Sequence, residues 1–300
     1  MKFDGVLFFP VTPFTGKGTV DTDVLAEHIG SRLEFQPGAV FPACGTGEFS
    51  ALGADEVASV VATAVDVVGG RMPVVAGTGG QFAHALECAR RAADAGADAL
   101  LVLPPYLASG SADGTVAYVE AIAAASPLPV IVYHRNTARY SVEAMVRLAA
   151  NPKVIGFKDG VGDLAHTQEV VIAVSALRRE DFLFFNGLST AELTQAAYRG
   201  IGVPLYSSAV FAMAPQIARA YYDAYVTGDE LTRRRLLDGF YFPLARLRDQ
   251  TPGFGVSLVK AGLRLSGLVV GSVRPPLTDP TAAQLDALRE LLETGRAFAA

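Results

Sequence analysis

The chain repeats one pattern eight times: a short apolar segment is followed by an alanine-rich segment with the spacing of a helix. The apolar segments do not alternate polar and apolar side chains, which is typical of parallel strands buried on both faces. They span residues 5–12, 39–45, 73–79, 99–106, 129–135, 154–160, 182–188 and 203–209. Eight strand–helix units are the number that closes a parallel barrel, so we predict an α/β fold, the TIM (β/α)8 barrel.

The alternative to a barrel is a doubly wound open sheet. Such a sheet more often carries a glycine-rich dinucleotide fingerprint after its first strand, and the chain has none there. After the eighth predicted strand the pattern stays helical, near residues 215–228, 230–249, 256–266 and 281–298. We therefore predict a barrel over residues 1–229 and a C-terminal helical extension over residues 230–300 that packs on it.

Composition and charge exclude several classes of function. Apolar residues make up 51% of the chain, as in a globular protein, and the net charge of −5 without a long basic block makes nucleic acid a poor partner. No apolar run reaches the roughly 18 residues of a membrane span, and the N-terminal segment lacks the pattern of a signal peptide. Two cysteines and four scattered histidines predict a reduced, cytoplasmic protein without a metal site.

The predicted strand ends indicate the kind of ligand. In a TIM barrel the active site lies at the carboxyl ends of the strands. Here those ends are rich in hydroxyls, glycines and backbone amides, with one lysine and few carboxylates. Because hydroxyls and N–H groups can hold a carboxylate without a metal, we predict a small anionic ligand. Residues at these ends include Thr12, Gly45, Thr46, Gly47, Glu48, Tyr106, Tyr133, Arg135, Lys158, Asn186, Gly187, Ser189, Ser207 and Ser208.

Lys158 is the one lysine that this prediction places at the catalytic face. Side chains alternate along a strand, so a Lys158 that points into the barrel turns Phe157 and Asp159 away. A buried lysine without a carboxylate partner has a lowered pKa, and its free amine can attack a carbonyl to form a Schiff base. Two other roles stay open here: Lys158 anchors a substrate carboxylate, or it pairs across the barrel with Glu48.

Tyr133 ends the neighbouring fifth strand, where its phenol could relay protons to a bound substrate. The alternative is a core tyrosine whose hydroxyl reaches the rim. Arg135 points to the same side and either binds a carboxylate or forms a rim salt bridge, whereas His134 faces outward. Cys44 lies near the mouth without a histidine partner in sequence reach, so we interpret it as a packing residue.

Four motifs stand at predicted strands: PVTPF in the first, GTGE after the second, VYHRN at the end of the fifth and GFKDG at the end of the sixth. Together they resemble the dihydrodipicolinate synthase / N-acetylneuraminate lyase superfamily. The resemblance extends from Val6 to the C-terminal helices. Within the superfamily, GFKDGVGD, YHRN, NGLSTAE and YSSAVF are most similar to the 5-dehydro-4-deoxyglucarate dehydratase branch.

The resemblance implies a lyase that dehydrates and decarboxylates 5-dehydro-4-deoxy-D-glucarate through a Schiff base on Lys158, with Tyr133 moving protons. It implies no metal or organic cofactor, and a homo-oligomer, a tetramer or a dimer. The residues it implies at the carboxylate next to the keto group are Gly45, Thr46 and Gly47. Those it implies at the far end of the substrate are Asn186, Gly187, Ser189, Ser207 and Ser208.

Two departures from the synthase branch of this superfamily bear on the reaction. That branch has a glycine followed by a threonine pair after the second strand, whereas this chain has Cys44 and then Gly45. It also has a second tyrosine where this chain has Leu107. Both missing hydroxyls belong to the proton relay of that branch, so dihydrodipicolinate synthesis is disfavoured. The first alternative is another Schiff-base lyase of the superfamily: a 2-keto-3-deoxy acid aldolase, an N-acetylneuraminate aldolase or the disfavoured dihydrodipicolinate synthase. The second is a non-catalytic keto-acid-binding barrel.

Overall fold

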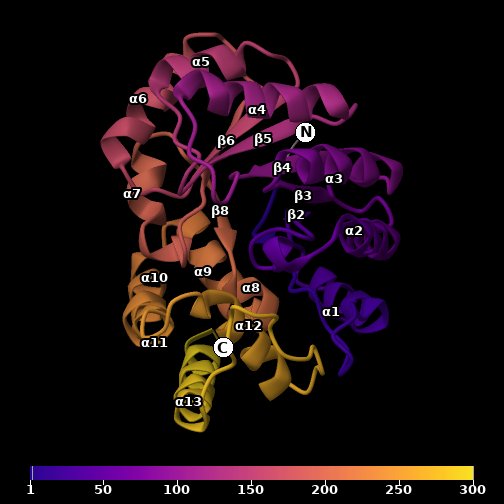
Figure 1. The fold of residues 1–300 in the computed structure, drawn as a ribbon. Coiled ribbons are helices and arrows are strands. Elements are labelled where there is room, and N and C mark those ends of the chain that lie inside the picture. The colour runs from indigo at the N-terminus through magenta and orange to yellow at the C-terminus, as the bar shows by residue number, and fades with distance from the viewer. Residues whose placement is uncertain (2, 300) are drawn as a thin grey trace.

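The computed structural model describes residues 1 and 3–299, and a parallel eight-stranded barrel lies at its centre (Figure 1). Its strands are β1 (Leu7–Phe8), β2 (Ala39–Val40), β3 (Val75–Gly79), β4 (Ala99–Leu103), β5 (Val130–His134), β6 (Val154–Asp159), β7 (Leu183–Asn186) and β8 (Leu205–Ser208). The predicted fold class is confirmed. Each strand is shorter than its apolar segment, because the segment ends leave the hydrogen-bonded ladder and continue as loops.

The strands pair in the order β2-β1-β8-β7-β6-β5-β4-β3. The barrel closes between β2 and β3 through a parallel bridge of Val40 with Val74. Between β5 and β6, Tyr133 lies in register with Lys158, and between β6 and β7, Lys158 lies in register with Phe185. Residues in register on parallel strands point to the same face, so these three side chains share the barrel interior.

Helices alternate with the strands and surround the barrel. They are α1 (Thr22–Leu33), α2 (Ala54–Val68), α3 (Phe82–Asp94), α4 (Ala112–Ala125), α5 (Val142–Ala149), α6 (Leu164–Ser175) and α7 (Gln195–Gly200). Four of them begin after a residue whose side-chain oxygen accepts an N–H of the first turn, which satisfies an otherwise unpaired donor. These N-cap residues are Asp21, Ser111, Ser141 and Asp163. Short 3-10 turns, η1 (Phe49–Ala51) and η2 (Ala191–Leu193), follow β2 and β7.

The chain after β8 is helical, as predicted. It forms α8 (Val210–Met213), α9 (Pro215–Thr227), α10 (Glu230–Leu236), the π-helical η3 (Leu237–Tyr241), α11 (Phe242–Arg248), α12 (Phe254–Leu265) and α13 (Ala282–Ala299). The helix expected over 230–249 is thus interrupted by η3. Pro243 lies in the first turn of α11, directly after this interruption. Because proline has no N–H, it cannot donate an α-helical hydrogen bond back to η3, and the regular ladder of hydrogen bonds is broken there.

The C-terminal helices lie together with α8 and α9 on one side of the barrel (Figure 1). Leu288 and Leu292 of α13 are buried in the same apolar cluster as the barrel residues. The predicted division between residues 229 and 230 falls between α9 and α10, and the assignment of residues 230–300 as an extension packed on the barrel stays a prediction. Among the described residues, no helix has the length and apolar character needed to cross a membrane.

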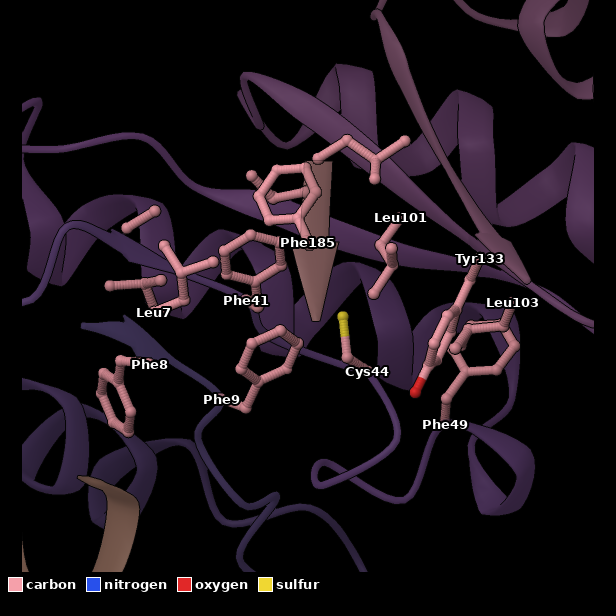
Figure 2. Packing of buried hydrophobic residues seen from close by; sticks show 14 of the residues in the cluster. Leu7, Phe8, Phe9, Phe41, Cys44, Phe49, Leu101, Leu103, Tyr133 and Phe185 are labelled. Carbon is pink, nitrogen blue, oxygen red and sulfur yellow. The ribbon is translucent and has the colours of Figure 1, made fainter. Parts of the chain in front are cut away.

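Aromatic side chains pack inside the barrel. Phe9 and Phe41 stack with ring centroids 4.4 Å apart. Figure 2 shows these two rings with Phe185 on one side of Cys44, and Tyr133 with Phe49 on its other side. Apolar side chains therefore fill this part of the barrel interior, and polar chemistry is expected at the rim formed by the carboxyl ends of the strands.

Candidate active site

A cavity of about 640 Å³ opens at the carboxyl ends of the strands. The barrel contributes an inner wall that includes Tyr133 and Lys158, and the C-terminal extension contributes an outer wall that includes Arg248 and Arg274. The position of the cavity agrees with the strand-end prediction. The outer wall was missed, because the helical pattern beyond residue 230 does not say which end of the barrel those helices cover.

Lys158 projects from the end of β6 into this cavity and is only 5% exposed. Its Nζ lies 4.2 Å from the ring centroid of Phe9 and 4.5 Å from that of Tyr133. Glu48, a carboxylate that lines the cavity, pairs with Lys260, and among the described residues no carboxylate forms an ion pair with Lys158. The amine thus lies between two rings with no opposite charge in contact.

This environment lowers the pKa of Lys158 to about 7. Burial is the main cause, because a desolvated ammonium loses its hydration, and the nearby positive charge of Arg135 adds to the effect. At neutral pH a large fraction of Lys158 is therefore the free amine. A free amine is the form that attacks a carbonyl carbon.

Tyr133 holds its hydroxyl between two partners at the cavity wall. Its Oη donates to the carbonyl oxygen of Gly187 at 2.7 Å and accepts an N–H of Arg135 at 2.8 Å. Burial raises the pKa of Tyr133, and the charge and hydrogen bond of Arg135 oppose that rise. The phenol is therefore fixed in place beside Lys158 rather than free to rotate.

Gly187 is required by close approach. A Cβ built at this position would lie 2.6 Å from Cε of Lys158 and 2.8 Å from Cε2 of Tyr133. Both distances are far inside van der Waals contact, so any larger residue would displace the two side chains. Gly187 lines the cavity, and its carbonyl oxygen anchors Tyr133; its predicted contact with the substrate stays a prediction.

The neighbours of Lys158 along β6 face away, which confirms the alternation argument. Asp159 is 1% exposed and accepts the N–H groups of Val161 and Gly162 together with the hydroxyl of Tyr198. His134 likewise packs outward, against the ring of His166. The carboxylate of Asp159 therefore supports the loop after β6 and does not neutralise Lys158.

Glu48 binds Lys260 rather than Lys158. Lys260 Nζ lies 2.6 Å from Glu48 Oε1, with both side chains buried, and the N–H of Arg274 donates to Glu48 Oε2 at 2.8 Å. The pairing of Lys158 with Glu48 is thereby excluded. The prediction that Lys158 is the one lysine at this face is also wrong, because α12 brings Lys260 there. Sequence spacing could not place an extension helix on the barrel rim.

Of the three predicted ligand contacts in the loop after β2, two line the cavity and one does not. Gly45 and Thr46 line it. Gly47 lies behind them, packed on Ala43, and its carbonyl oxygen accepts the hydroxyl of Thr12 at 2.7 Å. Gly47 is predicted to contact the ligand, but it lies outside the cavity lining and instead shapes the loop from behind.

The serines and the asparagine after β7 and β8 also divide into two groups. Ser189 and Ser207 line the cavity. Asn186 is fully buried and its amide donates to the carbonyl oxygen of Ala191 at 3.1 Å, while Ser208 donates to Glu192 at 2.5 Å. The predicted substrate contacts of Asn186 and Ser208 are corrected: both side chains face the outer layer and hold the turn after β7.

Where the synthase branch has two hydroxyls, this chain has Gly45 and Leu107, and Cys44 replaces the glycine before the first of them. Burial raises the pKa of Cys44 to about 12, so this residue is a neutral thiol, consistent with packing. Leu107 is 98% exposed and lies outside the cavity lining. Neither position supplies a proton donor or acceptor to Tyr133.

Fold and site together define a class: a (β/α)8 barrel that carries a buried, partly neutral lysine on its sixth strand and a tyrosine beside it on the fifth. The chain belongs to the dihydrodipicolinate synthetase family, whose model matches residues 2–294.

Sequence relatives narrow the comparison. The chain is 52% identical over 294 residues to the "Probable 5-dehydro-4-deoxyglucarate dehydratase 1" of Streptomyces avermitilis, covering 98% of this chain and 94% of the relative. It is 40% identical over 290 residues to a protein of Paracidovorax citrulli named as a probable 5-dehydro-4-deoxyglucarate dehydratase, covering 96% and 94%.

Solved structures match over nearly the whole chain. The dihydrodipicolinate synthase of Oceanobacillus iheyensis superposes with a TM-score of 0.88 at 26% identity, covering 98% of this chain and 97% of that one. A prophage protein of the dihydrodipicolinic acid synthase family from E. coli K12, solved in complex with pyruvate, gives a TM-score of 0.86 at 26% identity, covering 99% of both chains.

Proposed function

We propose that this protein is a class I lyase that converts 5-dehydro-4-deoxy-D-glucarate to 2,5-dioxopentanoate, CO2 and water. The observation that carries the proposal is Lys158, whose buried amine has a pKa of about 7 and lies in register with Tyr133. The names of relatives at 52% identity support this substrate. No metal or organic cofactor is needed, because the lysine itself provides the electron sink.

The first step joins Lys158 to the C5 ketone. The neutral amine attacks the carbonyl carbon, a C–N bond forms, and the resulting carbinolamine loses its hydroxyl as water after taking the proton of Tyr133. The products are an iminium ion and a Tyr133 phenolate. The phenolate then removes a proton from C4, which the iminium has made acidic, and an enamine results.

Dehydration and decarboxylation follow from the same electron pair. The enamine expels the C3 hydroxyl, which leaves as water with the Tyr133 proton, and a conjugated iminium forms. The C1–C2 bond then breaks, CO2 departs, and its electron pair moves through the conjugated system to nitrogen. Protonation at C4 by solvent, conversion of the C2 enol to an aldehyde and hydrolysis of the iminium by water release the product. The proton left on the Lys158 amine returns to the Tyr133 phenolate, which restores both residues.

The cavity wall supplies candidate groups for both carboxylates. We assign Gly45 and Thr46 to the carboxylate beside the keto group and Ser189 and Ser207 to the distal end, since all four line the cavity. Hydroxyl and amide donors hold a carboxylate in place, and orientation of this kind supplies rate. The proposal also includes a cytoplasmic homo-oligomer, a tetramer or a dimer.

Product analysis with the six-carbon keto-diacid tests the proposal. CO2 and 2,5-dioxopentanoate are the expected products, and borohydride added during turnover should attach the reduced substrate to Lys158, as located by mass spectrometry. Release of pyruvate would instead indicate an aldolase. A Lys158→Ala variant that keeps its activity, or a wild-type protein without an adduct, would contradict the Schiff base.

A further inference from the structure

Arg135 occupies a position that the proposed reaction has not used. It follows the last residue of β5, is half-buried and lines the cavity. Its Nη1 lies 2.8 Å from Tyr133 Oη and 3.4 Å from the carbonyl oxygen of Gly187. Backbone hydrogen bonds in both directions between Arg135 and Ala138, of 3.0 and 2.9 Å, fix the start of the loop that carries it.

The hydrogen-bond arrangement gives Tyr133 one charged donor. A phenol has a single proton, and Tyr133 uses it on Gly187, so the N–H of Arg135 meets the remaining lone pairs of the oxygen. Among the described residues, the side chains at the two positions with missing hydroxyls cannot take part. Gly45 has no side chain and Leu107 is exposed and apolar. Arg135 is therefore the group that meets any negative charge formed on Tyr133 Oη.

We propose that Arg135 is the positioning residue of the proton transfer: its guanidinium orients Tyr133 and stabilises the phenolate that forms each time the Tyr133 proton leaves. This inference rests on the proposed function. In the proposed sequence the phenolate forms twice, once when the carbinolamine loses water and once when the C3 hydroxyl leaves. A hydrogen bond from a charged donor strengthens as the acceptor becomes an anion, so the interaction favours the reacting state.

Arg135 also acts on Lys158 through its charge. It disfavours the ammonium form, so removal of this positive charge should raise the pKa of Lys158. The same removal should raise the pKa of Tyr133, which Arg135 now holds down against burial. The other titratable groups that act on this pair are Cys44 after β2 and Asp159 on β6, and Tyr133 itself acts on Tyr106 after β4.

The test measures proton transfer separately from the full reaction. Pyruvate is a simple 2-oxo acid, and the exchange of its methyl protons with deuterium from solvent requires only an imine and a base. Arg135→Met should slow this exchange and the dehydratase kcat by about 10- to 100-fold, as expected for the loss of a hydrogen bond to a charged group. Borohydride should still trap an adduct in this variant, and the acid limb of its pH profile should move to higher pH.

Two further variants make the result specific. Arg135→Lys keeps the charge without the planar fork, so its acid limb should stay near that of the wild type while exchange is slowed. Arg139→Met removes an exposed arginine of the same loop and should leave exchange, kcat and the pH profile unchanged. Exchange in Arg135→Met within twofold of the wild type, or an unmoved acid limb, overturns the role of Arg135.

The two proposals fail in different ways. If the wild type exchanges pyruvate protons but releases no CO2 from the keto-diacid, the proposed substrate is wrong and the exchange data still decide the role of Arg135. If the wild type exchanges pyruvate and the Arg135→Met variant does so equally well, the inference fails and the proposed function stands.

Discussion

At the residue scale, the central fact is that burial changes what a lysine can do. Lys158 lies against the rings of Phe9 and Tyr133, and its ammonium form loses more hydration than its surroundings return. Its carboxylate neighbour Asp159 is turned away by the pleat of β6. The alternation of side chains along β6, which the sequence predicts, therefore keeps the Asp159 carboxylate away from Lys158. In contact, that negative charge would hold Lys158 in its ammonium form.

The pH dependence of activity should report this amine. Because burial lowers the pKa of Lys158 to about 7, the ammonium form predominates below that pH and kcat/KM should fall about tenfold per pH unit there. Steady-state rates with the keto-diacid between pH 5 and 9 provide the measurement. A kcat/KM that still rises tenfold per pH unit up to pH 9, as expected for a lysine of ordinary pKa, would contradict the neutral-amine mechanism.

A second prediction concerns Gly187. In Gly187→Ala the new methyl group would lie 2.6 Å from Lys158 Cε, so the lysine and Tyr133 must move apart and kcat should fall by at least tenfold. Gly200→Ala is the matched control, because nothing lies within 4 Å of its Cβ position. Circular dichroism should show both variants folded. A fully active Gly187→Ala variant would show that catalysis does not depend on the close approach of Gly187 to Lys158 and Tyr133.

At the scale of elements, the barrel and its extension meet at a buried charge cluster. Glu48 on the loop after β2 pairs with Lys260 of α12 and accepts the backbone N–H of Arg274. Burial lowers the pKa of Lys260, and Glu48 counteracts this. The ion pair thus fixes the outer wall of the cavity to the loop that carries Gly45 and Thr46.

Removing one charge of this ion pair should destabilise the fold more than removing both charges together. Glu48→Gln leaves the ammonium of Lys260 buried without a counter-charge, so the free energy of unfolding should fall by about 3–5 kcal/mol. The double variant Glu48→Gln with Lys260→Met removes both charges and should recover part of that loss. Denaturant titrations of the two single variants and the double variant give the coupling energy, and strictly additive losses would show that the pair is not coupled.

At the scale of the whole molecule, the extension is packed as part of the barrel protein. Leu288 and Leu292 of α13 are buried, and Gly295 lies so close to Ile217 and Phe240 that a Cβ would meet them at 2.5 and 2.7 Å. Contacts of this kind join α13 to α9 and η3 at core density. The predicted division at residues 229 and 230 therefore marks a change of sequence pattern, and we expect the barrel and the extension to unfold together.

Leu292→Ala tests this expectation. If α13 shares the barrel core, the variant should lose about 2–5 kcal/mol of unfolding free energy in a single cooperative transition. Leu231→Ala, at a residue that is 81% exposed, should change it by less than about 0.5 kcal/mol. Two separate transitions, with only the smaller one shifted by Leu292→Ala, would show that the extension folds as its own unit.

The sequence alone determined the barrel, its eight strands and the direction of Lys158, because strand alternation and the repeat of strand and helix are local properties of the chain. It also placed Tyr133 beside Lys158, since strand order in a (β/α)8 barrel follows chain order. These inferences needed no knowledge of contacts between distant segments.

Only the tertiary structure decided what surrounds that pair. It assigned Glu48 to Lys260, turned Asn186 and Ser208 away from the cavity, and brought Arg135 onto Tyr133 Oη. Each of these depends on where a loop or an extension helix returns to the barrel. The physical reason is that hydrogen bonds and ion pairs are satisfied between segments far apart in the chain, and local pattern does not specify which distant group becomes the partner.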